Sequence, residues 1–140
     1  DSSNHILSEI TKNKKIIIFG VPGAFTPTCS EKHLPGFINL YNQFQAKGVN
    51  DIYCLSVNDL FVMKAWLESF PKGYLINGIA DGNADFAKSM QLTADYSGGF
   101  MGMRCKRFAL VADQNNIIKL FVEEKGEFFA SSAENILNNL

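Results

Sequence analysis

The chain has 140 residues, of which 46% are hydrophobic and 19% are charged, and its 13 basic and 14 acidic side chains leave a net charge of −1. This length suits a single core, so we expect one domain over residues 1–140. The near-neutral charge argues against nucleic-acid binding, because the small basic cluster of Arg104, Lys106 and Arg107 has no second cluster beside it. No apolar run approaches the roughly 20 residues that cross a bilayer, so we expect no membrane partner.

The three cysteines, Cys29, Cys54 and Cys105, form no C-x-x-C pair and show no Cys/His spacing typical of zinc. This pattern predicts neither a disulfide framework nor a metal site. The glycine-rich run over residues 97–102 does not match a dinucleotide or phosphate-binding loop, so we expect no cofactor. We expect a reducing compartment, either the cytoplasm or the matrix of a mitochondrion or plastid after removal of a targeting segment.

Hydrophobic patterning predicts a βαβ unit in the first half of the chain. A β-branched run over residues 16–19 indicates a buried strand, which a Pro-Gly pair ends. Apolar residues at helical spacing predict a helix over residues 29–47, which Pro35 kinks or restarts. Residues 51–57 are apolar on both faces and predict a central strand, joined to the first by a right-handed crossover.

The second half of the chain adds shorter elements that complete a thioredoxin-like order. They are a helix over residues 60–70 capped by Asn58-Asp59, a strand over 76–80, a helix over 83–90, a loop over 97–102, strands over 107–112 and 117–122 joined by a hairpin, and a final helix to Leu140 capped by Ser131 or Ser132. In the first of these helices we expect core contacts from Phe61, Met63, Trp66 and Leu67. A βαβ unit followed by a ββα unit is the layout of the thioredoxin fold. We therefore expect an α/β protein with a central mixed β-sheet flanked by helices.

Cys29 lies where the first strand turns into the first helix. Thr26 with Pro27 forms an N-cap and N1 pair, and Thr28 with Glu31 has the spacing of a capping box, so either register can begin the helix. Both registers place Cys29 in the first turn, where unpaired N–H groups and the positive end of the helix dipole favour a thiolate. The alternative is a packed, unreactive cysteine, because free cysteines are among the most buried residue types.

The run Pro22-x-x-x-Thr26-x-x-Cys29 matches the signature of the peroxiredoxins. The similarity is to the type II branch, also called type 5, and it covers nearly the whole chain, with its clearest segments at residues 21–37, 54–66, 104–110 and 131–137. The resemblance implies a thioredoxin fold with peroxiredoxin-type additions. The N-terminal β-hairpin with which that family usually begins is expected to be missing from this chain.

The resemblance implies a role for four residues. Cys29 is expected to be the peroxidatic cysteine, whose thiolate attacks a peroxide oxygen and becomes a sulfenic acid. Thr26 is expected to bond the thiolate or the peroxide, and Pro22 to shield the pocket from water. Arg107 is expected to hold the sulfur ionised and to bond the peroxide oxygens with its guanidinium fork. From the sequence alone, Arg107 is equally compatible with a surface arginine at the start of a strand.

Three neighbouring side chains have less defined roles. Lys106 precedes Arg107 directly, so alternation along an extended chain places it on the opposite face and predicts a solvated side chain. Arg104 is a possible helper of Arg107. His33 follows Cys29 by one helical turn and could act as a base, but a thiolate needs none, so we expect a structural or reductant-binding histidine.

The sequence favours a mechanism with one cysteine. Cys54 lies 25 positions after Cys29, where some type II relatives carry a second cysteine. From the middle of a buried strand, however, it cannot bring its Cβ atom to about 3.8 Å from that of a helix-start cysteine without local unwinding. Relatives with a C-terminal resolving cysteine carry it where Ala130 stands, and Cys105 is expected to be packed or incidentally exposed. We expect recycling by glutathione or a glutaredoxin, with a thioredoxin-dependent mechanism through Cys54 as the alternative.

The chain is thus predicted to be a thiol peroxidase that reduces hydrogen peroxide and small organic hydroperoxides without metal, haem or flavin. A homodimer is expected, with Phe100 and Met101 of the glycine-rich loop as candidate contacts unless they only line the pocket. A disulfide reductase of the same fold is disfavoured because the chain lacks C-x-x-C. A non-catalytic binding or chaperone module that keeps Cys29 packed is the alternative from another functional class.

Overall fold

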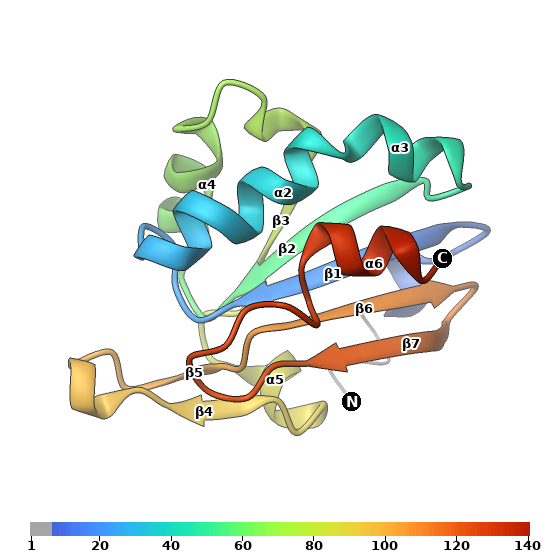
Figure 1. The fold of residues 1–140 in the computed structure, drawn as a ribbon. Helices are drawn as coiled ribbons and strands as arrows, with labels where there is room; N and C mark the ends of the chain where they lie inside the picture. The colour runs from blue at the N-terminus through green and yellow to red at the C-terminus, as the bar shows by residue number, and fades with distance from the viewer. Residues whose placement is uncertain (1–6) are drawn as a thin grey trace.

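The computed structural model describes residues 7–140 and contains a five-stranded and a two-stranded β-sheet (Figure 1). In chain order the elements are β1 (Lys15–Val21), the π-helical turn η1 (Cys29–His33), α2 (Leu34–Asn39), α3 (Tyr41–Ala46), β2 (Asp51–Ser56), α4 (Leu60–Glu68), the 3-10 turn η2 (Gly73–Leu75), β3 (Asn77–Ala80), α5 (Asp85–Ser89), β4 (Thr93–Asp95), the 3-10 turn η3 (Ser97–Gly99), β5 (Met103–Cys105), β6 (Phe108–Asp113), β7 (Asn116–Val122) and α6 (Ala133–Asn138). Residues 1–6, the start of the predicted 1–140 domain, lie outside the described residues. The extent of that domain and the missing N-terminal hairpin stay predictions.

The larger sheet has the strand order β3-β2-β1-β6-β7, with β1 at its centre. β1 pairs in parallel with β2 and antiparallel with β6, so the sheet is mixed, as predicted. Residues 16–19 of β1 are completely buried, which explains why this run is apolar throughout instead of alternating. The β6–β7 hairpin turns at Gln114 and Asn115, both with positive φ, which is the backbone of a type I′ turn.

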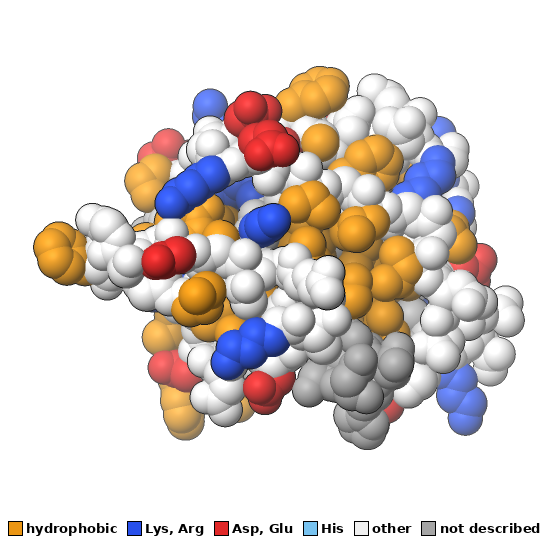
Figure 2. Space-filling model, turned by 90° about the horizontal axis from the view of Figure 1, so that it is seen from below, with side chains coloured by type: hydrophobic (Ala, Val, Ile, Leu, Met, Phe, Trp, Pro, Cys, Tyr) orange, Lys and Arg blue, Asp and Glu red, His pale blue; other side chains and the backbone are white. Residues whose placement is uncertain are grey.

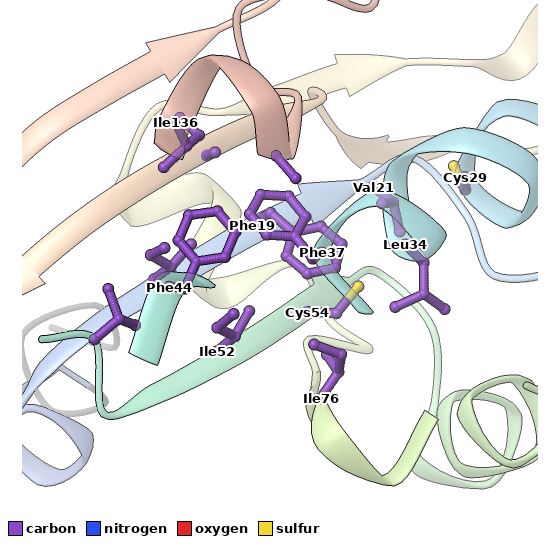
Figure 3. Close-up of a cluster of buried hydrophobic side chains, with 14 of the residues drawn as sticks. Phe19, Val21, Cys29, Leu34, Phe37, Phe44, Ile52, Cys54, Ile76 and Ile136 are labelled. Carbon is purple, nitrogen blue, oxygen red and sulfur yellow. The ribbon is translucent and has the colours of Figure 1, made fainter. Parts of the chain in front are cut away.

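Each face of the five-stranded sheet packs its own apolar cluster. α2, α3, α4 and α6 cover one face, and the cluster beneath them contains the stacked rings of Phe19, Phe37 and Phe44 (Figure 3). α5 lies against the opposite face, where Phe86 packs in a cluster with Leu110. The fold class, an α/β sheet flanked by helices, is the predicted one.

The face that carries α5 is less completely covered than the other one. Ile118, Leu120 and Val122 of β7 are 50%, 45% and 38% exposed. Leu120 and Val122 pair with Leu110 and Phe108 of β6, which belong to the cluster on that face. Figure 2 shows hydrophobic side chains gathered on this side of the molecule.

The helix predicted over residues 29–47 is divided into three parts. The N–H of Leu34 donates to the carbonyl of Cys29, five residues earlier, which makes the first part a π-helical turn. Pro35 follows in the first turn of α2, where its lack of an N–H costs nothing, so the helix restarts there as predicted. A second break, which the sequence did not predict, lies at Leu40, with φ −98° and ψ 7°.

One predicted core residue is wrong. Phe61 is 82% exposed, whereas Met63 and Trp66 of the same helix are buried. α4 begins where Asp59 caps it by accepting a hydrogen bond from the Val62 N–H, and Met63 and Trp66 pack its inner face into the core. Residues two apart on a helix do not face the same side, so burial of Met63 turns Phe61 outward.

Across residues 7–140, no helix is both long enough and apolar enough to span a membrane. The same residues contain no group of three or more His, Cys, Asp or Glu side chains that could hold a metal ion. The small sheet of β4 and β5, with three residues in each strand, was not predicted because such short strands leave no readable alternation. The predicted loop over residues 97–102 connects its two strands, apart from the short turn η3.

Candidate active site

The turn between β1 and the first helix places Cys29 close to the end of the central strand. Pro27 and Thr28 are already helical, and the Ser30 N–H donates to the Thr26 carbonyl at 2.9 Å, so the helix begins in the Thr26-Pro27 register. Cys29 is therefore in the first turn, as predicted, and it is 1% exposed. The Thr26 hydroxyl does not cap the helix. It donates to the Gly23 carbonyl at 2.5 Å.

Arg107 reaches Cys29 from the neighbouring strand. Its Nη2 donates to the Cys29 Sγ at 3.2 Å. Arg107 lies directly before β6, whose first residue, Phe108, pairs with Gly20 of β1. The Phe108 ring lies 2.0 Å from the position that a Cβ on Gly20 would occupy, so only glycine allows this close approach. The pairing of β1 with β6 thus places the guanidinium beside the thiol.

His33 binds the other arm of the same guanidinium. The Nη1 of Arg107 donates to His33 Nδ1 at 2.9 Å, and His33 Nε2 lies 2.9 Å from the Ser131 carbonyl. Because an arginine can only donate, Nδ1 is the acceptor and Nε2 carries the proton. Burial, followed by the positive charge of Arg107, lowers the pKa of His33 to about 3. His33 is thus a neutral, buried, structural histidine, and its acceptor nitrogen is occupied.

A cavity of about 630 Å³ opens beside the guanidinium, and Pro22, Thr26 and Arg107 all line it. Lys106 also lines this cavity and is half-buried, so the predicted solvated position on the face opposite Arg107 is only partly correct. Met101 lines the cavity as well, whereas Phe100 is 100% exposed.

Arg104 holds the loop before β5 and does not bind the thiol. Its Nε donates to the Met101 carbonyl at 2.9 Å, and its Nη1 donates to the carbonyls of Val57 at 3.3 Å and Pro22 at 3.5 Å. These bonds join three loops around the mouth of the cavity. Arg104 therefore supports the shape of the site, whereas the bond to Cys29 comes from Arg107.

The other two cysteines are buried in apolar surroundings. Cys54 is in the middle of β2, within the apolar cluster, and Figure 3 shows its sulfur separated from that of Cys29. Burial is the main cause that raises the pKa of Cys54 well above its ordinary value. Cys105 donates its S–H to the Val21 carbonyl, and its burial raises its pKa to about 12. All three cysteines are free, and Cys105 is packed, which is one of the two predicted outcomes.

A second cavity, of about 540 Å³, lies between α4 and β3. Its lining is mainly apolar, with Met63, Leu67 and Phe70 among its residues. None of the four predicted site residues lines it, so it is separate from the thiol and its arginine.

The chain is similar in sequence to known proteins of one family. The Redoxin family model matches residues 1–137. Peroxiredoxin-2C of Oryza sativa subsp. japonica is 49% identical over 131 residues, which is 94% of this chain and 81% of that protein. The chain belongs to the Redoxin family, in its type II peroxiredoxin branch. The predicted family and the predicted class of enzyme, a thiol peroxidase, are thereby confirmed.

Two solved structures resemble this peroxiredoxin closely. Reduced Prx3 from Vibrio vulnificus in complex with hydrogen peroxide is 47% identical, with a TM-score of 0.92 over 96% of this chain and 86% of that one. The Plasmodium falciparum antioxidant protein, a 1-Cys peroxiredoxin, is 38% identical, with a TM-score of 0.88 over 95% of this chain and 83% of that one. The thioredoxin fold of this peroxiredoxin is thus the fold of its relatives.

The predicted site residues Cys29, Thr26, Arg107 and Pro22 lie together, through the Arg107–Cys29 bond and the shared cavity, whereas the partners of His33 were not predicted. The Ser131 carbonyl receives a bond from His33, and Phe128 packs edge-on to the same ring at 5.2 Å. Both come from the segment between β7 and α6, almost 100 positions from His33. No spacing rule links positions so far apart, and a backbone carbonyl carries no side-chain signal.

Proposed function

We propose that Cys29 is the peroxidatic cysteine and that Arg107 stabilises the charge that moves during its reaction. The 3.2 Å contact from Arg107 Nη2 to Cys29 Sγ carries this proposal. The thiolate sulfur forms a bond to one peroxide oxygen while the O–O bond breaks. The other oxygen leaves with the bonding pair and takes up a proton, as water or an alcohol. The sulfur is oxidised to a sulfenic acid and the peroxide is reduced by two electrons.

Thr26 and Pro22 are proposed to shape the peroxide site next to this contact. The Thr26 hydroxyl already donates its hydrogen to the Gly23 carbonyl, so its oxygen is left to accept a hydrogen bond from the O–H of the peroxide. Pro22 has no N–H and lines the same cavity, so it adds an apolar wall without a competing donor. Hydrogen peroxide and small organic hydroperoxides fit this cavity of about 630 Å³.

We propose that the sulfenic acid is recycled by glutathione and glutaredoxin. Ala130 supplies no thiol at the C-terminal position, and Cys54 is completely buried in β2. A glutathione thiol would attack the sulfenic sulfur with loss of water, and a glutaredoxin or a second thiol would reduce the mixed disulfide. Because Cys29 is 1% exposed, its first turn has to open for this attack. A similar fold is carried by a relative described as a 1-Cys peroxiredoxin, which agrees with this scheme.

Recycling by thioredoxin through a Cys29–Cys54 disulfide is the second candidate. It needs the same opening at Cys29, and in addition Cys54 has to leave a strand that is paired on both sides, with β1 and with β3. The internal route therefore breaks more of the native structure than the external one.

A homodimer is proposed through the apolar residues around the site. Phe25, Leu60, Phe61 and Phe100 are between 59% and 100% exposed. The loop of Phe25 is joined to the start of α4 by a bond from the Ala24 N–H to Asn58 Oδ1 at 3.0 Å, so Phe25, Leu60 and Phe61 belong to one end of the molecule. A second copy would cover them. The proposed compartment is a reducing one, the cytoplasm or an organelle matrix, where the three free thiols stay reduced.

Peroxide consumption by the purified chain tests these proposals. We expect turnover with glutathione and glutaredoxin that survives Cys54→Ala combined with Cys105→Ala. A main product with a Cys29–Cys54 disulfide, together with lost turnover in the double variant, would support the thioredoxin route. A wild-type protein that did not consume peroxide above the background of the reductants would point to a binding or chaperone module.

A further inference from the structure

Behind Arg107, a row of buried hydrogen bonds extends from the thiol to a carboxylate that the reaction does not use. Glu123 is 7% exposed and follows directly after β7. Its Oε2 accepts bonds from the Phe129 N–H at 2.7 Å, the Ser131 N–H at 2.8 Å and the Ser131 hydroxyl at 2.7 Å. Burial by itself would raise the pKa of Glu123, but these bonds from Ser131 and Phe129 outweigh it and lower the pKa. Glu123 is therefore a fixed carboxylate.

Ser131 connects this carboxylate to the histidine. The side chain and N–H of Ser131 are both held by Glu123, which leaves its carbonyl to receive His33 Nε2 at 2.9 Å. Ser131 is completely buried, so water does not compete for these bonds. The N–H of Glu123 also donates to the Arg107 carbonyl at 2.9 Å, so Glu123 holds both the backbone of the arginine and the segment behind His33.

His33 connects Ser131 to the guanidinium of Arg107. With its proton fixed on Nε2, its Nδ1 faces Arg107 Nη1 at 2.9 Å, while Nη2 is left for Cys29. The ring packs against Phe19 at 4.9 Å and Phe128 at 5.2 Å, so it has little freedom to turn. A guanidinium that is fixed on one arm loses less conformational freedom when the other arm binds the reacting atoms.

We propose that Glu123, acting through Ser131 and His33, holds Arg107 in the position from which it contacts Cys29, so that His33 and Glu123 are positioning residues for peroxide reduction. This inference rests on the proposed role of Arg107. It gives a positioning role to His33 and Glu123, which are buried polar residues that do not touch the reacting atoms. In this view the segment between β7 and α6 is part of the machinery that orients the arginine.

A double-mutant cycle with Arg107 tests the proposal. His33→Phe keeps the ring in its aromatic surroundings but removes both nitrogen partners. In the wild-type background we expect it to lower kcat/KM for hydrogen peroxide by about 10-fold to 100-fold, the typical cost of a misplaced catalytic group. In an Arg107→Met background we expect no further fall, because the hydrogen bond through which His33 is proposed to act on the reaction has been removed. A general structural role would instead lower both backgrounds by the same factor, which would overturn the proposal.

A second, more conservative substitution tests the proposal in case His33→Phe does not fold. Glu123→Gln keeps the shape of the side chain but removes the charge that holds Ser131, and we expect about a tenfold fall in kcat/KM. This fall should also vanish in the Arg107→Met background. Glu134→Gln, an exposed carboxylate in the first turn of α6, is the matched control and should keep wild-type kcat/KM. If His33→Phe does not fold, the Glu123→Gln cycle decides alone.

The outcomes separate this inference from the proposed function. Arg107→Met with wild-type turnover would contradict the proposed role of the arginine itself. An impaired Arg107→Met protein in which His33→Phe and Glu123→Gln cause the same loss as in the wild type would overturn only the positioning role. Unchanged kcat/KM in both single variants would overturn it as well.

Discussion

The turn after β1 and the middle of β2 each bury a cysteine, and the two sites differ in what surrounds the sulfur. Cys29 is 1% exposed and Cys54 is 0% exposed, so solvent access does not distinguish them. A guanidinium donates to Cys29 Sγ at 3.2 Å, whereas Cys54 lies among apolar side chains. In those surroundings, burial raises the pKa of Cys54. The comparison teaches that a fixed positive donor, and not exposure, distinguishes Cys29, the proposed reactive thiol, from Cys54.

The largest effect is expected from Cys29→Ser. A hydroxyl is a far weaker nucleophile than a thiolate and does not form a sulfenic acid, so peroxide consumption should fall to the background rate of the reductant mixture. The thermal unfolding midpoint should stay close to that of the wild type, because the substitution replaces one atom. Residual turnover above background would mean that a second thiol reacts with peroxide and would remove the contrast between Cys29 and Cys54.

Arg107→Met is expected to have the next largest effect. Loss of one donor aimed at developing charge typically costs 100-fold to 1000-fold in turnover, and the alkylation of Cys29 by iodoacetamide at pH 7 should slow as well. Arg104→Met is the matched control. Because Arg104 binds only loop carbonyls, we expect a loss of less than about tenfold. Equal losses in the two variants would mean that turnover depends on positive charge near the pocket and not on the contact between Arg107 and Cys29.

The buried histidine predicts a dependence of stability on pH. The pKa of His33 is lowered to about 3 in the folded chain, from 6.5 in the unfolded chain. Between these values only the unfolded state takes up the proton, so stability is lost as the pH falls below 6.5, by up to about 1.4 kcal/mol per unit. The free energy of unfolding in urea at pH 7, 6 and 5 measures this slope. His33→Asn should flatten it, and an unchanged slope would show that His33 is not buried as a neutral ring.

The smallest effect on turnover is expected from replacing the two other cysteines. Cys54→Ala combined with Cys105→Ala should keep peroxide turnover with glutathione and glutaredoxin within about twofold, because the Nη2 of Arg107 donates to Cys29 Sγ and both other sulfurs are buried. Each substitution should cost about 1 kcal/mol of stability, since it leaves a small void in a packed core. In the native protein, iodoacetamide should label Cys29 first. Labelling of Cys54 at a similar rate would contradict the difference between the two sites.

The sequence predicted most of the fold because its main signals are local. The apolar run at residues 16–19, the helix restart at Pro35 and the Asp59 cap each act within a few positions, and each is found where expected. The failure at Phe61 has a tertiary cause. Its outward position depends on which face of α4 packs against the sheet, and apolar composition does not settle that rotation.

In the candidate site, too, some features follow from the local sequence and others from tertiary packing. By itself, the sequence determined that Cys29 lies in the first turn of a helix after a buried strand, because caps and breakers act on adjacent residues. Only the tertiary structure decided which cation reaches that thiol and what holds the cation in place. His33 lies 74 positions before Arg107 and 98 before Ser131, and it meets them because β6 pairs with β1 and the segment before α6 folds back over the site. Hydrogen bonds at about 3 Å depend on that packing, and no short-range pattern in the sequence encodes them.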